Sequence, residues 1–332
     1  MLIFDLETDN LLEDVTKVHC MVTQDTETGE VKTYSPNYIE DGIEALRDAQ
    51  QLGGHNIVSY DLPVLKKLYN FDYYGQVYDT LVASRLIWSN MKEKDMIKRS
   101  VDNKLIGSHS LKAWGQRLMF NKGAFGEQEA AWEEYTPEML EYCIQDVALN
   151  VKLYELILSK GCPEEPMQLE HDMNRLLIKQ QNVGFPFNVE KAQKLYTLLA
   201  ARKQDIEINL VDKMEPTVVE LKTKTKTIPF NPASRQQIAD RLQKRGWKPE
   251  EFTPSGDPKI DEKILSGIDM PEARLLTEYL MLNKRLGQLG NGKQAWLKLE
   301  RNGRIHGRVN HMGAVTSRCT HSDPNVAQVP SA

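Results

Sequence analysis

Residues Met1 to Thr8 read Met-Leu-Ile-Phe-Asp-Leu-Glu-Thr, and this stretch predicts the strand around which the chain is organised. Its aliphatic and aromatic residues form the short apolar run expected of a strand buried on both faces of a sheet. Asp5 and Glu7 interrupt the run, two residues apart. Because side chains of a strand alternate between its faces, both carboxylates project from the same face, about 7 Å apart along the chain.

The acidic pair predicts a metal site. Two buried carboxylates on one face repel each other and lose hydration, so we expect a cation between them. Hard divalent ions such as Mg²⁺ or Mn²⁺ prefer carboxylate oxygen. The simpler alternative is that Asp5 ends a strand and Glu7 begins a turn. Taken alone the pair does not exclude this alternative, so other segments must decide.

Composition restricts the class of protein. The 332 residues suffice for two or three domains. A net charge of −5 gives no overall basic signature, although a local basic face can still bind phosphates. The four cysteines are scattered without a CxxC pair, which predicts neither a disulfide framework nor a zinc site. No stretch approaches the roughly 18 apolar residues of a membrane span and no signal peptide is present, so we expect a cytoplasmic protein, in the host cell if viral, without a membrane partner.

Strand and helix patterns alternate over residues 1–162. After the first strand, segments 17–24 and 30–34 are strand-like and a Thr-Glu-Thr-Gly turn joins them, which predicts an antiparallel three-stranded start. Predicted helices span 38–50, 62–70, 80–89, 110–119 and 137–160, predicted strand segments span 53–58 and 77–79, and 92–108 and 121–134 are expected to be irregular. A meander followed by alternating helix and strand indicates a mixed α/β sheet.

A Pro/Glu-rich stretch at 161–166 predicts a linker and a domain boundary. Helices are expected beyond it, at 167–182, 189–213 and 271–289. Ser234 begins another predicted helix, with Gln237 three residues later at the spacing of a capping box. Arg301-Asn302-Gly303 predicts the turn of a hairpin, and 316–330 is rich in loop-forming residues.

Two further segments of the first half carry acids that fit the opening pair. Asp61 follows Asn56 at a strand-to-helix junction, where a side chain can face the carboxyl edge of the sheet. Tyr142 and Asp146 are four residues apart and share one face of the helix predicted at 137–160. An unpaired buried carboxylate in that apolar stretch would be costly. The alternatives are that Asp146 is a surface acid paired with Lys152 and that Tyr142 is a core residue.

Jointly these segments resemble the tyrosine subgroup of the DEDD exonuclease superfamily. The Asp5-x-Glu7 pair, the Asn56–Asp61 segment and the Tyr142-x-x-x-Asp146 segment match its three motifs in order. Each match is weak alone, whereas three in order at suitable spacing are specific. The resemblance implies a ribonuclease H-like fold and a 3′→5′ exonuclease that releases nucleoside monophosphates from a DNA end.

The same resemblance implies a role for each acid. Asp5, Glu7 and Asp146 would hold one divalent ion, Mg²⁺ or Mn²⁺, and Asp5 with Asp61 would hold the second. Two ions about 4 Å apart can stabilise both the attacking and the leaving oxygen of an in-line displacement. Tyr142 would orient the attacking water, since the ordinary tyrosine pKa of about 10 argues against a strong base.

Residues 316–330 read Thr-Ser-Arg-Cys-Thr-His-Ser-Asp-Pro-Asn-Val-Ala-Gln-Val-Pro, and this stretch resembles the start of the polymerase domain of family A DNA polymerases. Ser317 stands where that family usually has glycine. Further matches are Asp79-Thr80, Ser84-Arg85-Leu86, Gly107-Ser108-His109, Phe230 to Arg235 and Ile305-His306-Gly307. The chain is most similar, along essentially its whole length, to the replicative polymerases of short-tailed phages related to the T-odd group.

This resemblance implies three regions: a 3′-5′ exonuclease domain at 1–162, a linker and helical thumb at 163–295, and the start of a palm at 296–332. The implied partner is DNA, both as a single-stranded 3′ end and as a primer–template duplex. The residues expected to contact DNA are Asn56, Asn231, Ser234, Arg235, Lys284, Arg285, Arg318 and Gln328, with Arg241, Lys244 and Arg245 adding positive charge for phosphate. A solvated helix face is the alternative for any single one of these cations.

The thumb of related phage polymerases carries a long insertion that captures host thioredoxin. The corresponding stretch, 212–227, is short here, so thioredoxin binding is not expected. The chain stops at Ala332, before the fingers and the catalytic aspartates of the palm, which predicts either a split polymerase completed by a separate C-terminal chain or a truncated one. The alternatives are a self-standing DEDD exonuclease acting on DNA or RNA and a non-catalytic subunit that grips DNA.

Overall fold

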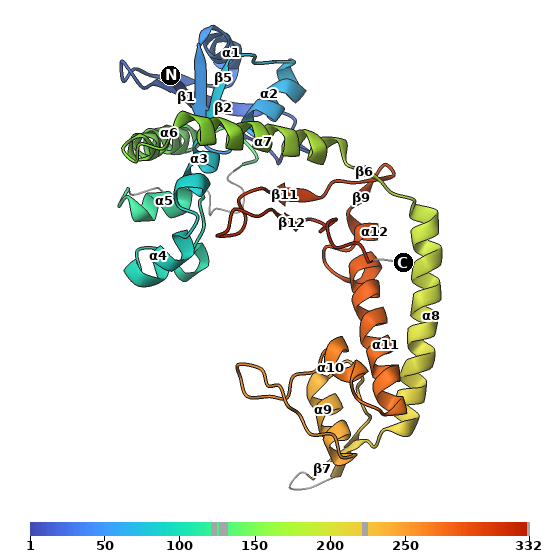
Figure 1. Ribbon diagram of the computed structural model, residues 1–332. Helices are drawn as coiled ribbons and strands as arrows, with labels where there is room; N and C mark the ends of the chain where they lie inside the picture. The colour runs from blue at the N-terminus through green and yellow to red at the C-terminus, as the bar shows by residue number, and fades with distance from the viewer. Residues whose placement is uncertain (121–124, 126–131, 221–224, 331–332) are drawn as a thin grey trace. The chain divides into compact units, whose positions relative to one another are not determined.

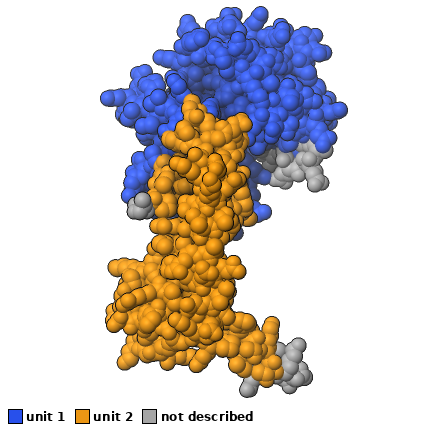
Figure 2. Space-filling view, turned by 90° about the vertical axis from the view of Figure 1, so that its right-hand side faces the viewer, with its two compact units in different colours: residues 1–182, 309–320 blue, residues 183–308, 321–332 orange. Residues whose placement is uncertain are grey.

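The computed structural model describes residues 1–120, 125, 132–220 and 225–330, without the side chains of 219 and 220. The chain divides into two compact units, coloured separately in Figure 2: residues 1–182 with 309–320, and residues 183–308 with 321–332. Over the described ranges, no helix is long and apolar enough to cross a membrane.

A five-stranded mixed sheet organises the first unit, in the order β3-β2-β1-β4-β5 (Figure 1). Its strands are β1 (Leu2–Thr8), β2 (Val18–Asp25), β3 (Val31–Tyr34), β4 (Gln51–Gly54) and β5 (Gln76–Asp79). The first three pair antiparallel, whereas β4 pairs parallel to β1 and β5 parallel to β4. The predicted antiparallel start and mixed sheet are confirmed, although β4 lies earlier in the chain than the strand expected at 53–58.

The helices of the first unit follow the predicted order. They are η1 (Pro36–Tyr38), α1 (Ile39–Asp48), α2 (Asp61–Tyr69), α3 (Thr80–Ile87), α4 (Met91–Lys98), η2 (Asn103–Leu105), α5 (Leu111–Arg117), α6 (Pro137–Leu158) and α7 (Glu164–Val183). Helix α7 begins inside the stretch that was expected to be a linker at 161–166. Most of the irregular segment expected at 121–134 lies outside the described residues.

The surface loop expected at 92–108 is wrong, because this segment contains most of α4 and all of η2. The Asp95 carboxylate is buried and accepts two hydrogen bonds from Arg117, at 3.0 and 2.8 Å. A buried charge is stable only when it is paired, so this contact holds α4 against α5. The two residues are 22 positions apart, and the local sequence pattern therefore gives no sign of their pairing.

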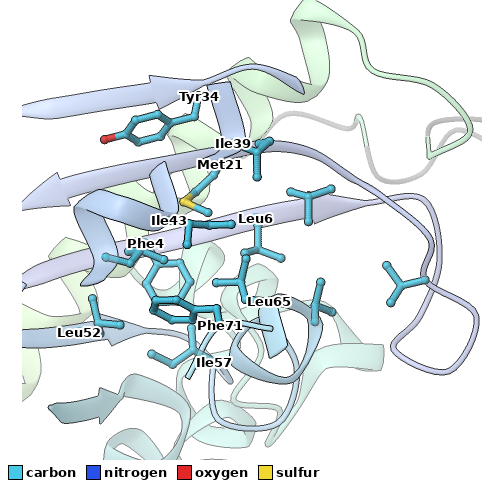
Figure 3. Close-up of a cluster of buried hydrophobic side chains, with 14 residues drawn as sticks. Phe4, Leu6, Met21, Tyr34, Ile39, Ile43, Leu52, Ile57, Leu65 and Phe71 are labelled. Atoms are coloured by element: carbon cyan, nitrogen blue, oxygen red, sulfur yellow. The ribbon is translucent and has the colours of Figure 1, made fainter. Parts of the chain in front are cut away.

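Strand β1 is buried on both faces, as its apolar run predicts. On one face Phe4 and Leu6 pack in a cluster with Ile43 of α1 and Leu65 of α2 (Figure 3). On the opposite face Ile3 packs in a second cluster with buried residues of α6, including Met139, Cys143 and Val147. Burying each of the larger side chains stabilises the fold by about 2 kcal/mol. The sheet of this unit is therefore covered by α1 and α2 on one side and by α6 on the other.

The second unit is mainly helical. Its elements are β6 (Phe185–Pro186), α8 (Val189–Lys213), β7 (Thr217–Glu220), β8 (Thr225–Ile228), α9 (Arg235–Lys244), α10 (Glu262–Ser266), α11 (Pro271–Leu286), the π-helix η4 (Gly287–Asn291), α12 (Trp296–Leu299), β9 (Glu300–Arg301) and β10 (Arg304–Ile305). Two short strands, β11 (Arg308–Asn310) and β12 (Thr320–Ser322), lie where the chain passes between the units.

Helices α8 and α11 form the long helical pair of the second unit. Helix α8 has the predicted bounds, and Arg202 on it binds Glu278 on α11 through two hydrogen bonds of 2.7 and 2.9 Å. Helix α11 ends at Leu286, before the predicted 289, because the chain continues as a π-helix. Strands β9 and β10 flank Asn302 and Gly303, which confirms the predicted hairpin turn.

Candidate functional site

The acidic pair of β1 faces helix α6. Ile3 packs against α6, and residues 3, 5 and 7 of a strand share one face, so Asp5 and Glu7 project toward the same helix. Glu7 is buried, and Asp5 is half-buried. The register places Asp5 opposite Val22 and Glu7 opposite Cys20 of β2, with an irregularity between Glu7 and Thr8.

A third side chain joins the pair. Ligand atoms of Asp5, Glu7 and Cys143 all lie within 4.8 Å of one another. The Cys143 thiol donates to the Asp5 carbonyl oxygen at 3.5 Å and lies 3.8 Å from Asp5 Oδ2. Sequence reasoning missed Cys143, although its position between Tyr142 and Asp146 offered a signal: residues 143 and 146 share one helix face.

The chemistry of this cluster favours a hard cation. Burial raises the pKa of the Cys143 thiol well above its usual range, and the nearby Cys20, Asp5 and Glu7 raise it further. The sulfur therefore stays protonated near neutral pH, and a protonated thiol is a poor metal ligand. The two carboxylates supply the oxygen donors that Mg²⁺ and Mn²⁺ prefer, so the donor set fits the predicted ions.

Asp61 is the first residue of α2 and lies beside β1. Its carboxylate is buried, and the backbone N–H of Leu6, the residue between Asp5 and Glu7, lowers its pKa. Burial raises the pKa of Asp61 to about 7, and the charge of Asp79 adds to this rise. Binding a cation would remove this penalty on the ionised carboxylate.

Asp146 is buried on α6, three residues after Cys143. This spacing directs it to the helix face that carries Cys143 toward Asp5. The predicted alternative of a surface acid is wrong, because the residue is only 6% exposed. Neither Asp61 nor Asp146 has a carboxylate oxygen inside the 4.8 Å cluster of Asp5, Glu7 and Cys143. The structure thus brings two of the four predicted acids into one cluster, and places Asp61 beside the strand that carries them.

Tyr142 precedes Cys143 on α6 and is half-buried. Its ring contacts Phe125 and Trp132, with ring centroids 5.7 and 6.0 Å away. These contacts fix the ring by aromatic packing, which agrees with the core role that was one reading of this residue. The expected role of the Tyr142 hydroxyl in orienting water stays a prediction.

Asn56 has a backbone role that the sequence did not indicate. Its φ of 68° lies in the left-handed region, which asparagine tolerates better than most residues. Its N–H donates to Asp79 Oδ1 at 2.9 Å. Asp79 itself is fully buried and was noticed only as part of the Asp79-Thr80 match. The predicted DNA contact of Asn56 remains a prediction.

Three of the predicted DNA-contact residues meet in the second unit. Lys284 and Arg285 of α11 and Gln328 line one cavity of about 680 Å³. Trp296 lines the same cavity and donates from Nε1 to the Asn325 carbonyl oxygen at 3.4 Å. Two cations beside an aromatic ring and amides can bind a phosphate and stack a base.

Asn231 and Ser234 act as local caps. The Ser234 hydroxyl accepts the Gln237 N–H at 3.4 Å, as the capping-box spacing predicts. The Gln237 side chain accepts from the Asn231 N–H at 2.9 Å, and Asn231 Oδ1 accepts from the Ala233 N–H at 2.9 Å. Arg235 is exposed at the start of α9. Of these three predicted DNA-contact residues, Asn231 and Ser234 thus have local structural roles.

The structure gives local partners to two arginines of the α9 region and corrects the expectation for Arg241. Arg241 is buried and donates to the Glu215 carbonyl oxygen and to Thr217 Oγ1, both at 2.7 Å. Arg245 pairs with Glu272 at 2.6 Å and donates to the Lys213 carbonyl oxygen. These guanidinium groups hold neighbouring segments together. Arg241 is buried and not available for phosphate contacts, whereas Arg245 remains exposed and its expected phosphate contact stays a prediction.

Arg318 lies in a turn of residues 314–318, closed by hydrogen bonds between Ala314 and Arg318 and between Ser317 and Ala314. Ser317 has a φ of 56°, in the left-handed region. Glycine adopts this conformation without strain, which gives a physical reason for the glycine that the related family uses there. Arg318 is exposed and donates from Nε to Thr316 Oγ1.

Comparisons with known proteins relate the chain to DNA polymerases. Residues 200–332 match the family model of DNA polymerase family A. The chain is 33% identical to a DNA-directed DNA polymerase of Enterobacteria phage T3 and 32% identical to one of Escherichia phage T7, in each case over 99% of its length. It spans 63% of the length of each phage protein. Both alignments extend over 441 residues, so these relatives contain segments without a counterpart in the 332-residue chain.

A solved structure shares the fold. The POL domain of Pol1 from M. smegmatis, in complex with DNA primer-template and dNTP, matches with a TM-score of 0.69 and 13% identity. The match covers 99% of this chain and 52% of that one. At this identity the likeness concerns the fold alone, a mixed α/β structure with many helices. Residues 200–332 are thus similar to DNA polymerase family A, and the chain along nearly its whole length is similar to the two phage DNA polymerases.

Proposed function

We propose that the chain is the 3′-5′ proofreading exonuclease and thumb portion of a phage-type family A DNA polymerase. The substrate is the 3′ end of a DNA strand, and the products are nucleoside 5′-monophosphates. The proposal assigns a ribonuclease H-like nuclease domain to residues 1–162, a linker and thumb to 163–295, and the start of a palm to 296–332. The two phage relatives are named DNA-directed DNA polymerases, which supports DNA as the partner.

One observation carries the nuclease part of the proposal. Asp5 and Glu7 share the face of β1 that meets α6, within 4.8 Å of Cys143. The backbone N–H of Leu6, between the two acids, lowers the pKa of the Asp61 carboxylate. Asp146 lies on α6 three residues after Cys143. Acids on β1, at the start of α2 and on α6 support the proposed site for divalent cations.

The proposal assigns a role in hydrolysis to each of the four acids and to Tyr142. Asp5, Glu7, Asp61 and Asp146 would hold the divalent cations. Once bound there, Mg²⁺ or Mn²⁺ supplies Lewis-acid stabilisation to the attacking water and to the leaving oxygen. Tyr142, held by its aromatic contacts, would orient the water with its hydroxyl group. Water adds to the terminal phosphorus while the bond to the preceding 3′ oxygen breaks, which leaves a new 3′-hydroxyl.

The cavity of the second unit supports the proposed grip on DNA. Lys284 and Arg285 are positioned to neutralise phosphates, and Trp296 offers a ring for stacking. Contacts of this kind do not read sequence, which suits a protein that must act at any position of a template.

The decisive experiment incubates the purified chain with a 3′-mismatched primer on a template, with Mg²⁺ and with EDTA. Wild type should release nucleoside monophosphates only with the metal. Asp5→Asn should lower the cleavage rate by at least about 100-fold while DNA binding is retained, because the amide loses the negative charge that a hard cation requires. Glu44→Gln is the matched control, an exposed acid of α1, and should cleave at the wild-type rate.

Other outcomes would identify the alternatives. If Asp5→Asn leaves every activity of the chain intact while DNA still binds, the chain is a non-catalytic subunit that grips DNA. Faster degradation of RNA than of single-stranded DNA would indicate an RNA-processing nuclease, since carboxylates do not distinguish the 2′-hydroxyl. Adding candidate palm-and-fingers chains to the same assay tests whether a separate C-terminal chain is a partner.

A further inference from the structure

Two adjacent residues outside the predicted acidic site, Asp79 and Thr80, connect the segments that carry Asp61 and Asp146. Both are fully buried at the junction of β5 and α3. A fully buried carboxylate is costly unless its oxygens are hydrogen-bonded, so the partners of Asp79 indicate why an acid stands there.

The Asp79 carboxylate joins two pieces of chain. It caps its own helix by accepting the N–H groups of Leu81 at 3.0 Å and Val82 at 3.4 Å. It also accepts the N–H groups of Asn56 at 2.9 Å and Val58 at 3.2 Å. These last two belong to the segment between β4 and α2, and lie five and three residues before Asp61. Asp79 therefore fixes the backbone that leads into the first residue of α2.

Thr80 reaches the other acid-bearing element. Its hydroxyl donates to Asn150 Oδ1 at 2.6 Å. Asn150 is buried on α6 and follows Asp146 by four residues, which is one helical turn. The same hydroxyl lies 2.9 Å from His55 Nδ1, beside the segment that Asp79 holds. The junction of β5 and α3 is thus hydrogen-bonded both to the segment that precedes Asp61 and to α6, the helix that carries Asp146.

A histidine fixes the backbone of this junction. His171 of α7 accepts the Asp79 N–H at Nε2, at 2.7 Å, and its Nδ1 donates to the Met167 carbonyl oxygen at 2.7 Å. With one ring nitrogen accepting and the other donating, the imidazole is neutral and held in one orientation. Asp79 therefore has little freedom to move relative to α7.

We propose that Asp79 and Thr80 are positioning residues of the nuclease site, which set the separation of Asp61 and Asp146. This inference rests on the proposed function. Neither side chain is exposed, so neither touches the substrate, and their effect passes through the segments they bind. Residues that orient metal ligands from outside the coordination sphere commonly change metal affinity or activity by 10–100-fold when they are replaced.

The test replaces the Thr80 hydroxyl by a methyl group of similar size. Thr80→Val should lower kcat on a 3′-mismatched primer by about 10-fold or more, leave the KM for DNA within about threefold, and raise the Mn²⁺ concentration needed for half-maximal activity. Thr80→Ser keeps the hydroxyl and should restore all three values to near wild type. Ser84→Ala, which removes another fully buried hydroxyl of α3, should leave them unchanged.

A second variant keeps the inference testable if Thr80→Val does not fold. Asn150→Ala removes the acceptor on α6 and should produce the same change in Mn²⁺ dependence. If Thr80 acts through Asn150, the double variant should be no worse than either single variant. Wild-type Mn²⁺ dependence in folded Thr80→Val or Asn150→Ala, or failure of Thr80→Ser to restore activity, would overturn the proposal.

A direct measurement separates this inference from the proposed function. Mn²⁺ binding to the full chain, followed by electron paramagnetic resonance, needs no catalysis. If wild type binds Mn²⁺ but does not cleave DNA, the proposed function fails, and weaker binding by Thr80→Val still supports the positioning role. If wild type cleaves DNA and Thr80→Val matches it in both assays, only the positioning role fails. A wild-type chain that neither cleaves nor binds Mn²⁺ overturns both.

Discussion

The thiol of Cys143 donates to the backbone carbonyl oxygen of Asp5 at 3.5 Å. This contact joins the middle of α6 to the strand that carries the acidic pair, 138 positions away in the sequence. It also places a soft sulfur atom beside two hard carboxylates, so its influence on metal binding can be tested directly.

Cys143→Ala should preserve Mg²⁺-dependent cleavage. Burial raises the pKa of this thiol, so the protonated sulfur contributes no charge to the site. We expect a cleavage rate within about threefold of wild type and a loss of stability of about 1 kcal/mol from the lost packing. Single-turnover cleavage over a range of Mg²⁺ concentrations measures the first quantity, and urea unfolding measures the second. A rate loss as large as that of Asp5→Asn would mean that sulfur is a ligand.

Gly54→Ala should destabilise the first unit. A Cβ at position 54 would lie 2.1 Å from Ile57 Cγ2 and 2.9 Å from the Phe4 carbonyl oxygen, and both neighbours are fully buried. Overpacking of this kind costs about 2 kcal/mol, which a thermal or urea melt detects. Because Phe4 precedes Asp5, cleavage should slow as well. Gly287→Ala is the control, since its Cβ would meet nothing within 4 Å and its φ is −58°. An unchanged melting temperature for Gly54→Ala would contradict the tight packing of β4 on β1.

Ser317→Gly should stabilise the turn at 314–318. Ser317 has a φ of 56°, and a residue with a Cβ in the left-handed region is strained by roughly 1 kcal/mol relative to glycine. Equilibrium unfolding should therefore give a gain of up to about 1 kcal/mol. Ala314→Gly, in the same turn but without a positive φ, should instead lose about 0.5–1 kcal/mol through the greater freedom of its unfolded chain. Equal effects of the two substitutions would refute the explanation by strain.

The half-buried His109 should make the fold sensitive to acid. Partial burial, together with the charges of Arg85 and Arg117, lowers the pKa of His109 to about 4 from its ordinary 6.5. Below pH 6.5 the His109 side chain is protonated in the unfolded chain, whereas in the folded chain it stays neutral until the pH approaches 4. The contribution of His109 to stability is therefore fully present above pH 6.5 and is lost as the pH falls toward 4. The free energy of unfolding that is lost through this group is at most about 3 kcal/mol. His109→Gln should therefore lose less stability than wild type between pH 6.5 and 4 in urea melts, and parallel pH profiles would contradict this assignment.

Lys284 and Arg285 should supply salt-dependent affinity for duplex DNA. Each phosphate contact that is removed lowers the slope of log affinity against log salt by about 1. Lys284→Ala and Arg285→Ala should each show this change in fluorescence anisotropy titrations, without altering sequence preference. Lys248→Ala, an exposed lysine outside the cavity, should keep the wild-type slope. If all three variants behave alike, the cavity is not the DNA-binding surface.

The contrast between local and distant contacts explains which features of this chain were predictable. The alternation of β1 predicts that Asp5 and Glu7 share a face, because strand geometry alone determines it. The Ser234 cap of α9 and the bounds of α8 likewise depend on residues within a few positions of each other. The sequence pattern does not predict the helices within 92–108, because the order of this segment depends on the pairing of Asp95 with Arg117.

By itself, the sequence determined the mixed sheet, the shared face of Asp5 and Glu7, and the family resemblance that the comparisons confirm. Only the tertiary structure decided that Cys143 meets Asp5 and that Asp79 binds the segment before Asp61. It also decided that Arg241 is used inside the protein. The physical reason is range: periodicity and caps act between residues a few positions apart, whereas these contacts form only when helices stack on a sheet or on one another.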